Sequence, residues 1–325
     1  MAWAERMQSV LVGLAALLGI VVGLGLPQVG ALGEHLVLPA LLVMLTAIFV
    51  QLDVAAVGQV RHAKGLVAAS LVLNYLFTPA LAWVLGAGLL GDQPDLRIGL
   101  LLLLVTPCTD WYLVFTAIAR GHTGIAAALL PVNLILQVLL LPVYVLLLGG
   151  AAAAVEAGTL AQAVLLVLVV PLLTAVLLRR FAPRSVAARG QAAAGVVVVP
   201  LLCLAVAAMF AWQAPVVVDH AVELLLLLGP LMIFFMVLPL AAALTAKLLR
   251  LPSAQRVTLI MTTTARNSPI ALSIAVAAFP DRPLIAVALV IGPLIELPIL
   301  AVLSHLVRSR GPAQGDLQPK ASDTG

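Results

Sequence analysis

The chain has 325 residues, of which 64% are hydrophobic and only 9% are Asp, Glu, Lys or Arg. A soluble domain carries about 25% charged residues, so this composition excludes a water-soluble globular fold. The formal net charge of +4 fits loops on the cytoplasmic side of a membrane, and no nucleic-acid partner is expected. Apolar stretches of about 20 residues, without period-two alternation, predict an all-α membrane protein rather than a β-barrel.

Ten apolar stretches predict ten transmembrane helices in the lipid bilayer. In chain order they are residues 9–26, 36–57, 65–90, 97–119, 123–149, 158–180, 191–214, 220–248, 255–279 and 283–307. The first stretch is interpreted as a retained span rather than a signal peptide, because nine further stretches follow it. Residues 309–325 are rich in polar residues, Gly and Pro, and they predict a disordered tail.

The distribution of Lys and Arg predicts the orientation of the chain. If the N-terminus is cytoplasmic, the inner segments hold 14 of the 17 basic residues. These are Arg6, Arg61, Lys64, Arg120, Arg179, Arg180, Arg184, Arg189, Lys247, Arg250, Arg256, Arg308, Arg310 and Lys320. The outer segments hold only Arg97 and Arg282. The positive-inside rule therefore predicts cytoplasmic N- and C-termini and a multi-pass protein of the cell membrane.

The two halves of the chain resemble each other. Pro39, Pro79 and Pro142 align with Pro200, Pro239 and Pro298, and Arg97 aligns with Arg256, at offsets that drift slowly from 161 to 156. Chance matches among 21 prolines are the alternative. A unit of five spans enters the membrane upside down when it is repeated, so the sequence predicts inverted repeats at 1–150 and 151–308. Inverted repeats are typical of carriers that bind their solute at the bilayer midplane.

The fourth and ninth stretches each contain a proline and a polar cluster in mid-span, 159 residues apart. The first cluster is Thr106-Pro107-Cys108-Thr109-Asp110, and the second is Thr262-Thr263-Thr264-Ala265-Arg266-Asn267-Ser268-Pro269. Ordinary proline kinks would also fit. Pro107 and Pro269 interrupt helix hydrogen bonding. Backbone groups without a helix partner are tolerated at membrane depth only inside protein or where they line a cavity. We therefore expect two broken helices that cross and form a solvent-reachable binding pocket.

Three ionisable residues lie deep within spans: Asp110, Arg266 and Glu296. Each costs about 2.5 kcal/mol or more at the bilayer centre, which favours pairing or function. Asp110 and Arg266 form either a structural ion pair or one whose opening is coupled to substrate. Glu296 either clamps neighbouring helices by a hydrogen bond or carries a proton.

Cysteine and amide side chains offer further candidates. Cys108 stands in the polar interruption and is either a small buried hydrophobe or a soft ligand for trivalent arsenic or antimony. Cys203 has apolar neighbours and is interpreted as core. Asn74, Asn133 and Gln137 either line a cavity or bond between helices.

With these residues in view, the chain resembles the bile acid:sodium symporter superfamily, and within it the arsenite efflux permeases of the arsenical-resistance type. Pro107-Cys108-Thr109 is similar to the cysteine motif of these permeases, and Gly292-Pro293-Leu294-Ile295-Glu296-Leu297-Pro298 is similar to their span-ten motif. Asn267 falls where the superfamily has asparagine in span nine. The resemblance implies ten spans, no cofactor, and participation of Cys108 and Glu296 in exporting uncharged arsenite in exchange for protons.

The chain also departs from the pattern of this family. Only Asn267 remains of the paired asparagines in span nine, and Asp110 has no counterpart in the arsenite motif. Arg266 stands where sodium-coupled members carry a sodium ligand, and a fixed guanidinium opposes cation binding. The coupling ion H⁺ is therefore favoured over Na⁺.

Two transport hypotheses follow. In the first, the protein exports arsenite or antimonite and requires Cys108. In the second, it carries a small organic anion whose carboxylate meets Arg266 and half-helix N-termini. The predicted substrate-binding residues are Cys108, Thr109, Asp110, Arg266, Asn267 and Ser268, and the predicted proton carriers are Glu296 and Asp110. A metalloid at Cys108 is expected only for arsenite, and no other metal site is predicted.

An intramembrane enzyme is disfavoured, because the sequence has neither a His-Glu-x-x-His pattern nor a serine-nucleophile elbow. A channel is disfavoured by the repeated interruptions.

Overall fold

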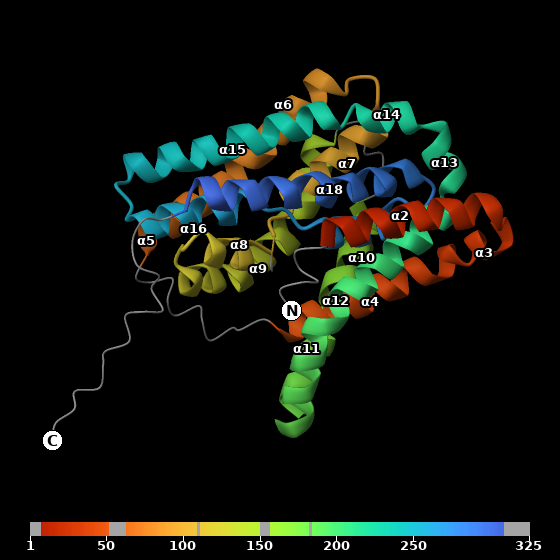
Figure 1. Ribbon diagram of the computed structural model, residues 1–325, viewed down its shortest axis with the longest axis horizontal. Helices are drawn as coiled ribbons and strands as arrows, with labels where there is room; N and C mark the ends of the chain where they lie inside the picture. Colours follow the sequence, from red (N-terminus) through yellow and green to blue (C-terminus); the bar gives the residue numbers. More distant parts are fainter. Residues whose placement is uncertain (1–7, 52–62, 109–110, 150–156, 182–183, 309–325) are drawn as a thin grey trace.

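The computed structural model describes residues 8–51, 63–108, 111–149, 157–181 and 184–308, and all regular structure in these ranges is helical (Figure 1). The helices before residue 150 are α2 (Gln8–Gly25), α3 (Pro27–Ala31), α4 (Gly33–Val50), α5 (Lys64–Val72), η2 (Leu73–Phe77), α6 (Thr78–Leu89), α7 (Pro94–Val105), α8 (Trp111–Ile118) and α9 (Thr123–Leu148). Those after it are α10 (Ala157–Val164), η4 (Leu165–Val169), α11 (Val170–Phe181), α12 (Arg184–Trp212), α13 (Ala214–Asp219), α14 (Ala221–Leu225), α15 (Leu228–Leu248), α16 (Ser253–Thr264), α17 (Ser268–Ala278) and α18 (Pro283–Leu306). The two η segments are π-helical turns within longer helices.

Seven helices of the described residues are long and apolar enough to cross a membrane. They lie at Gly33–Val50, Lys64–Leu89, Thr123–Leu148, Gly158–Phe181, Ala193–Trp212, Ala221–Leu248 and Pro283–Leu306. The first predicted span holds a shorter apolar helix, and the fourth and ninth are each divided into two short helices. An integral membrane protein is therefore established, whereas the count of ten spans stays a prediction.

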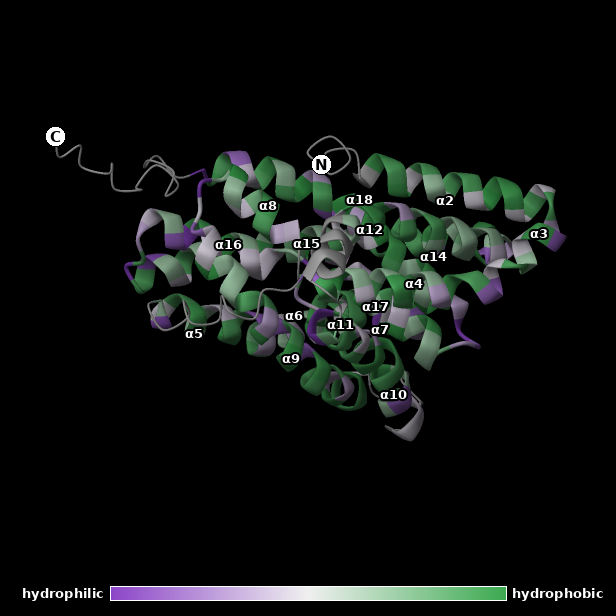
Figure 2. Ribbon diagram, turned by 90° about the horizontal axis from the view of Figure 1, so that it is seen from below, coloured by the Kyte–Doolittle hydropathy of each residue, from purple (hydrophilic) through white to green (hydrophobic). Residues whose placement is uncertain are grey.

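The outer surface of the helices is apolar. Large hydrophobic side chains are exposed along α2 and α15, including Leu17 and Val21 on α2 and Leu240 and Leu244 on α15. Figure 2 shows the hydrophobic colouring continuing around the outside of the helices. Water would oppose such a surface, but lipid tails match it, so these faces are the ones that contact the bilayer.

The helices form two groups. The smaller group consists of α2, α4, α12 and the continuous helix α10–η4–α11, with α12 packed along both α2 and α4 (Figure 1). The larger group contains α5 to α9 and α15 to α18. Contacts between the groups include α17 against α4 and α10, and α18 against α2. Each group takes helices from both 1–150 and 151–308, and the division into two repeats stays a prediction.

Glycines let α12 approach its neighbours closely. A Cβ atom added to Gly23 of α2 would lie 2.7 Å from the Cβ of Ala214, and one added to Gly33 of α4 would lie 2.9 Å from the Cβ of Trp212. Both glycines also face backbone carbonyl oxygens of the segment around α12. Because lipid gives no hydrophobic drive for helices to associate, close backbone contact at small residues supplies van der Waals attraction instead.

Replacing Gly23 with leucine is expected to separate α2 from α12 and to lower the melting temperature of the detergent-solubilised protein. Overpacking a tight interior costs about 1–3 kcal/mol, and the backbone on the facing side leaves little room for adjustment. Gly88→Leu is the matched control, because nothing lies within 4 Å of a Cβ added at Gly88. Equal melting temperatures for the two variants would show that the contact between α2 and α12 is not tight.

Candidate functional site

Two helices are interrupted in the interior of the larger group. The first ends at Val105, after which Thr106 has an extended backbone with φ −101° and ψ 95°. The second ends at Thr264, after which Ala265 has φ −71° and ψ 140°. Pro107 lies within the first interruption, and Pro269 lies in the first turn of α17, where its missing N–H leaves no helix hydrogen bond unmade.

The two interruptions cross and pair with each other. Pro107 and Arg266 form an isolated antiparallel bridge. The Cys108 N–H donates to the Ala265 carbonyl at 3.1 Å, and the Asn267 N–H donates to the Thr106 carbonyl at 2.8 Å. The backbone groups released by each break are therefore satisfied by the other break, as a low-dielectric interior requires.

Threonine hydroxyls around the crossing bond to their own helices. The hydroxyls of Thr262, Thr263 and Thr264 donate to carbonyls one turn earlier in α16, at 2.6–2.8 Å. The Thr106 hydroxyl does the same to Leu102 at 2.9 Å. The threonines that made these sequences look like a polar binding cluster are thus largely engaged by local backbone.

Arg266 is the most heavily bonded side chain at the crossing. Its Nη1 donates to the Leu104 carbonyl at 2.7 Å, its Nη2 to Asn74 Oδ1 at 2.8 Å, and its Nε to the Thr264 carbonyl at 3.3 Å. Nη2 also donates to the Thr263 carbonyl. The guanidinium carbon lies 5.4 Å from the ring centroid of Phe234, within the range of a cation–π contact. The residue is 2% exposed, so its charge is compensated by protein rather than water.

Glu296 and Asn267 hold the second interruption in place. A Glu296 carboxylate oxygen accepts the backbone N–H of Arg266 at 2.8 Å, and Glu296 is buried on α18. Asn267 caps α17, its side-chain oxygen accepting the Ile270 N–H at 3.1 Å. Asparagine is among the best residues at this position, because its oxygen satisfies an N–H that the helix leaves open.

Ser268 and Cys108 are two further buried residues of the crossing. The Ser268 hydroxyl is buried and finds no hydrogen-bond partner among the described residues. A Cβ added to Gly292 of α18 would lie 2.9 Å from this hydroxyl and 2.8 Å from a methyl group of Leu103, so the hydroxyl packs closely against α18 because Gly292 has no side chain. Cys108 is fully buried, whereas Cys203 is half-buried on α12.

The structure brings together five of the residues predicted to form the site: Cys108, Arg266, Asn267, Ser268 and Glu296. All five are at most 5% exposed, so the expectation of a solvent-reachable pocket is wrong for this conformation, in which the crossing is closed. Thr109 and Asp110 lie outside the described residues, and so does the predicted Asp110–Arg266 pair. Within the described ranges, no group of three His, Cys, Asp or Glu side chains could hold a metal ion.

Sequence reasoning missed two partners of Arg266. Asn74 was one of several amides with a possible cavity role, and its pairing with Arg266 had no signal because 192 residues separate them. Phe234 was not singled out, since one phenylalanine in an apolar span looks like any other. The backbone carbonyl of Asn133 accepts a hydrogen bond from the Tyr75 hydroxyl at 2.8 Å. The side-chain amide nitrogen and oxygen of Gln137 are without a hydrogen-bond partner in the described part of the chain.

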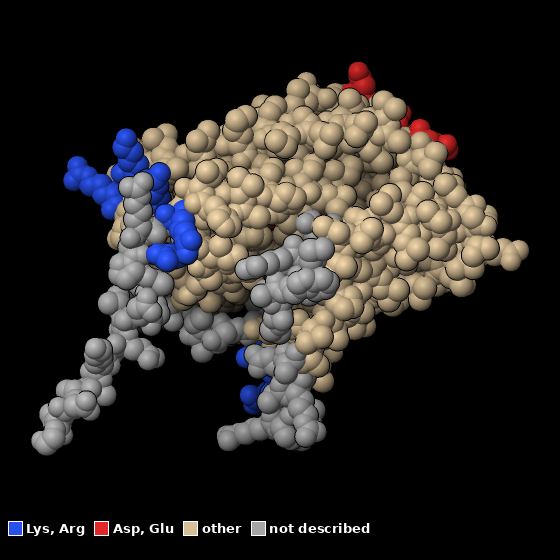
Figure 3. Space-filling model, in the orientation of Figure 1, with Lys and Arg blue, Asp and Glu red and all other residues tan. Residues whose placement is uncertain are grey.

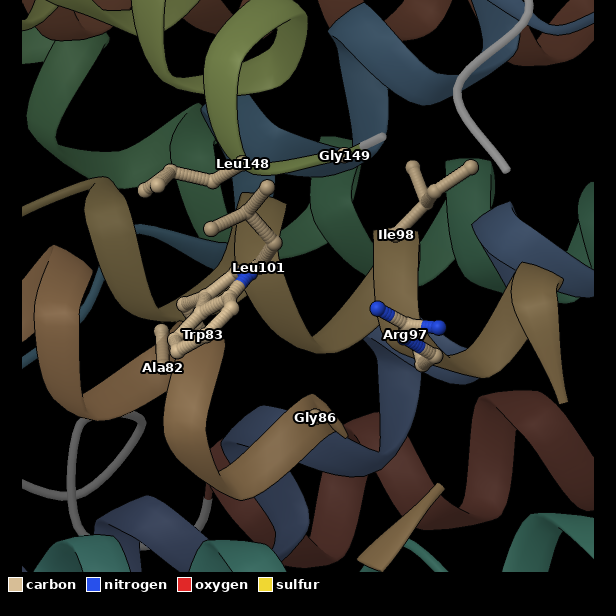
Figure 4. A pocket seen from close by; sticks show the side chains of 8 residues that line it. All are labelled: Ala82, Trp83, Gly86, Arg97, Ile98, Leu101, Leu148 and Gly149. Atoms are coloured by element: carbon tan, nitrogen blue, oxygen red, sulfur yellow. The ribbon is translucent and has the colours of Figure 1, made fainter. Parts of the chain in front are cut away.

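A small pocket lies apart from the crossing, between α6, α7 and the end of α9. Figure 4 shows Trp83, Arg97 and Leu148 among its lining residues. Arg97 is about two helical turns before the end of α7 at Val105. The pocket therefore belongs to the far end of α7 rather than to the site.

Long apolar helices, a lipid-facing apolar surface and two broken helices that meet in the interior define an integral membrane transporter. The family model described as the Sodium Bile acid symporter family matches residues 38–220. Since this match spans more than half of the chain, the protein belongs to that family. It is also 26% identical over 305 residues to the arsenical-resistance protein Acr3 of Corynebacterium glutamicum, an alignment covering 89% of this chain and 82% of the relative.

Two neighbouring substitutions are expected to separate structural from solute-facing roles. Asn267→Ala removes the cap of α17 and should lower stability by about 1 kcal/mol. Ser268→Ala removes a buried hydroxyl without a described partner, so the melting temperature should stay the same or rise. Thermal unfolding of both variants in detergent checks this contrast. A Ser268→Ala variant less stable than Asn267→Ala would mean that the hydroxyl is a structural bond donor.

Proposed function

We propose that this protein is a secondary active transporter that exports uncharged arsenite or antimonite across the cell membrane in exchange for protons. The observation that carries the proposal is the position of Cys108, fully buried and hydrogen-bonded through its backbone at the crossing of the two broken helices. Sulfur is a soft ligand that prefers soft species such as trivalent arsenic. The relative of this chain in Corynebacterium glutamicum is named an arsenical-resistance protein.

Arsenite can bind to the thiol of Cys108 without any other reactant. The thiol condenses with arsenite, forming one As–S bond and releasing one water molecule, and hydrolysis reverses the step on the other side of the membrane. The Ser268 hydroxyl and the start of α17 supply polar contacts for the remaining arsenic hydroxyls. The described conformation is closed, so solute reaches Cys108 only after α17 and α18 move relative to the smaller helix group.

A second candidate is an ion-coupled carrier of small organic anions, and the description of the family as sodium bile acid symporters favours it. This candidate needs a guanidinium that can meet a carboxylate. A guanidinium has five N–H groups, and that of Arg266 already donates to four oxygens of its own chain. An uncharged solute therefore fits the crossing better than an anion.

The architecture that we propose has ten spans in two inverted repeats, residues 1–150 and 151–308. The offset of 159 that aligns the two interruptions equates Pro107 with Arg266, which are the two residues of the antiparallel bridge. It also equates Cys108 with Asn267 and Thr106 with Ala265, so that exchanging the two breaks turns one backbone hydrogen bond into the other. Every antiparallel bridge has this exchange symmetry, but here the two bridged residues are also the ones that the repeat alignment equates, as expected where two inverted repeats meet.

We propose cytoplasmic N- and C-termini. Figure 3 shows Lys and Arg gathered at the end of the molecule where α15 leads into α16 and again near the far end of α11, with Asp and Glu at the side near α14. The basic residues around the turn between α15 and α16 are Lys247 at the end of α15, Arg250 in the turn itself and Arg256 near the start of α16. Cytoplasmic ends of membrane helices carry the excess of positive charge.

Cys108→Ser is expected to abolish arsenite protection in a sensitive host, because a hydroxyl lacks the soft sulfur. Arsenic accumulation should rise from the wild-type level to that of the host without the transporter. Cys203→Ser is the matched control and should protect like wild type. Equal protection by Cys108→Ser and wild type, or protection by neither, overturns the proposed substrate. In that case, uptake of a bile salt or a 2-keto acid by wild type but not by Arg266→Gln would support the anion carrier.

Glu296→Gln is expected to uncouple arsenite transport from the proton gradient, because an amide has no titratable proton to exchange. Everted vesicles carrying wild type should accumulate arsenite when a pH gradient is imposed and lose it when a protonophore is added, whereas Glu296→Gln should respond to neither. Glu34→Gln, at an exposed position in the first turn of α4, is the control. A gradient response retained by Glu296→Gln rules out Glu296 as the proton carrier.

The proposed orientation is tested in the same everted vesicles, whose outer surface is the cytoplasmic face of the membrane. Protease added outside should remove the tail after residue 308, and protection of the tail contradicts the proposed orientation.

A further inference from the structure

The guanidinium of Arg266 is enclosed by four oxygens, which we call the oxygen cage. They are the carbonyl oxygens of Leu104, Thr263 and Thr264 and the side-chain Oδ1 of Asn74. These atoms come from three segments: the end of α7, the end of α16, and the π-helical turn η2. The cage therefore assembles only when both half-helices and η2 are in place.

The composition of the oxygen cage is that of a cation site. The last carbonyls of a helix have no partner within the helix, and they carry the negative end of its dipole. Here the ends of α7 and α16 both supply such carbonyls to the guanidinium of Arg266, and Asn74 adds an amide oxygen. Backbone carbonyls and amide oxygens are the ligands that proteins use for hard cations, as in channel filters and oxygen-lined sites.

The positive charge inside the cage is part of the chain itself. The face of Phe234 at 5.4 Å adds an aromatic contact that favours a cation. Glu296 accepts the backbone N–H of Arg266, so a carboxylate also lies beside this turn of the chain.

We propose that the oxygen cage is a monovalent-cation site whose permanent occupant is the Arg266 side chain, so that the protein works without Na⁺ at this point. A mobile cation would have to displace a guanidinium that is covalently attached and bonded to all four oxygens. Its effective concentration far exceeds that of a dissolved ion. This inference deepens the proposed function by assigning the ion requirement of the site, but its test needs no solute.

Removing the side chain of Arg266 should expose the latent cation site. In Arg266→Ala, four buried oxygens lose their donor, and a small dissolved cation can enter the cage. The purified variant should melt below wild type in choline chloride, whose cation is too large for the cage. Sodium chloride or guanidinium chloride at the same low concentration should raise its melting temperature by about 2 °C or more, in a saturable way.

Three further proteins define the controls. Wild type should show no difference between sodium and choline, because its cage is full. Arg282→Ala removes a different guanidinium, one that pairs with the half-buried carboxylate of Asp95, and it should show no cation-specific shift. Adding Asn74→Ala to Arg266→Ala removes one oxygen of the cage and should weaken the shift.

Each outcome decides the proposal. A cation-specific shift confined to Arg266→Ala, and reduced by Asn74→Ala, supports it. A sodium-specific shift in wild type shows that the cage accepts a dissolved ion beside Arg266 and overturns it. The proposal is also overturned if Arg266→Ala is isolated in folded form and does not respond to sodium or guanidinium. It is overturned too if Arg266→Ala cannot be isolated in any of the three salts, whereas Arg266→Lys, which keeps a tethered cation, can be isolated. Failure of arsenite transport would leave these melting temperatures unaffected, so the two proposals fail separately.

Discussion

Two helices that stop inside the bilayer create the constraint on which the rest of this structure depends. Each stop frees carbonyl and N–H groups where no water can reach them, and each unpaired group there costs several kcal/mol. The pairing of Thr106 and Cys108 with Asn267 and Ala265 satisfies the groups nearest the breaks. The guanidinium of Arg266 satisfies carbonyls just before them. Neither broken helix could remain in the membrane without the other.

The same constraint selects which polar groups are available to a solute. The hydroxyls of Thr262, Thr263 and Thr264 serve their own helix, and Asn267 serves as a cap. The hydroxyl of Ser268 is buried without a described partner. Proximity of polar residues in the sequence therefore overstates the size of the binding chemistry, because most of it stabilises the backbone. The thiol of Cys108 and the hydroxyl of Ser268 gain importance by comparison.

The two helix groups differ in how they are held together. Close glycine contacts join α2 and α4 to α12, so the smaller group is packed at backbone distance and resists deformation. The larger group also has close glycine contacts, such as Gly99 of α7 against Ala288 of α18, and it is joined at its centre by the crossing and by Arg266. Contacts between the groups involve α17, which begins at the crossing, and α18, which carries Glu296. A movement of one group against the other would therefore alter the surroundings of Cys108 without breaking either group.

The sequence by itself determined the helical membrane class, because apolar runs in lipid leave the backbone few alternatives, and it located the two interruptions through their prolines and polar clusters. It also predicted that Cys108, Asp110, Arg266 and Asn267 meet, since matching positions in two similar halves imply proximity, and it singled out Glu296 separately as an ionisable residue within the tenth span. Asp110 lies outside the described residues. Only the tertiary structure decided what each of these side chains does. Hydrogen-bond partners such as Asn74 and Leu104 lie more than 150 residues from Arg266 in the chain, and a one-dimensional pattern carries no signal for them. Whether the crossing is open or closed likewise depends on the packing of whole helix groups, which no local spacing of residues encodes.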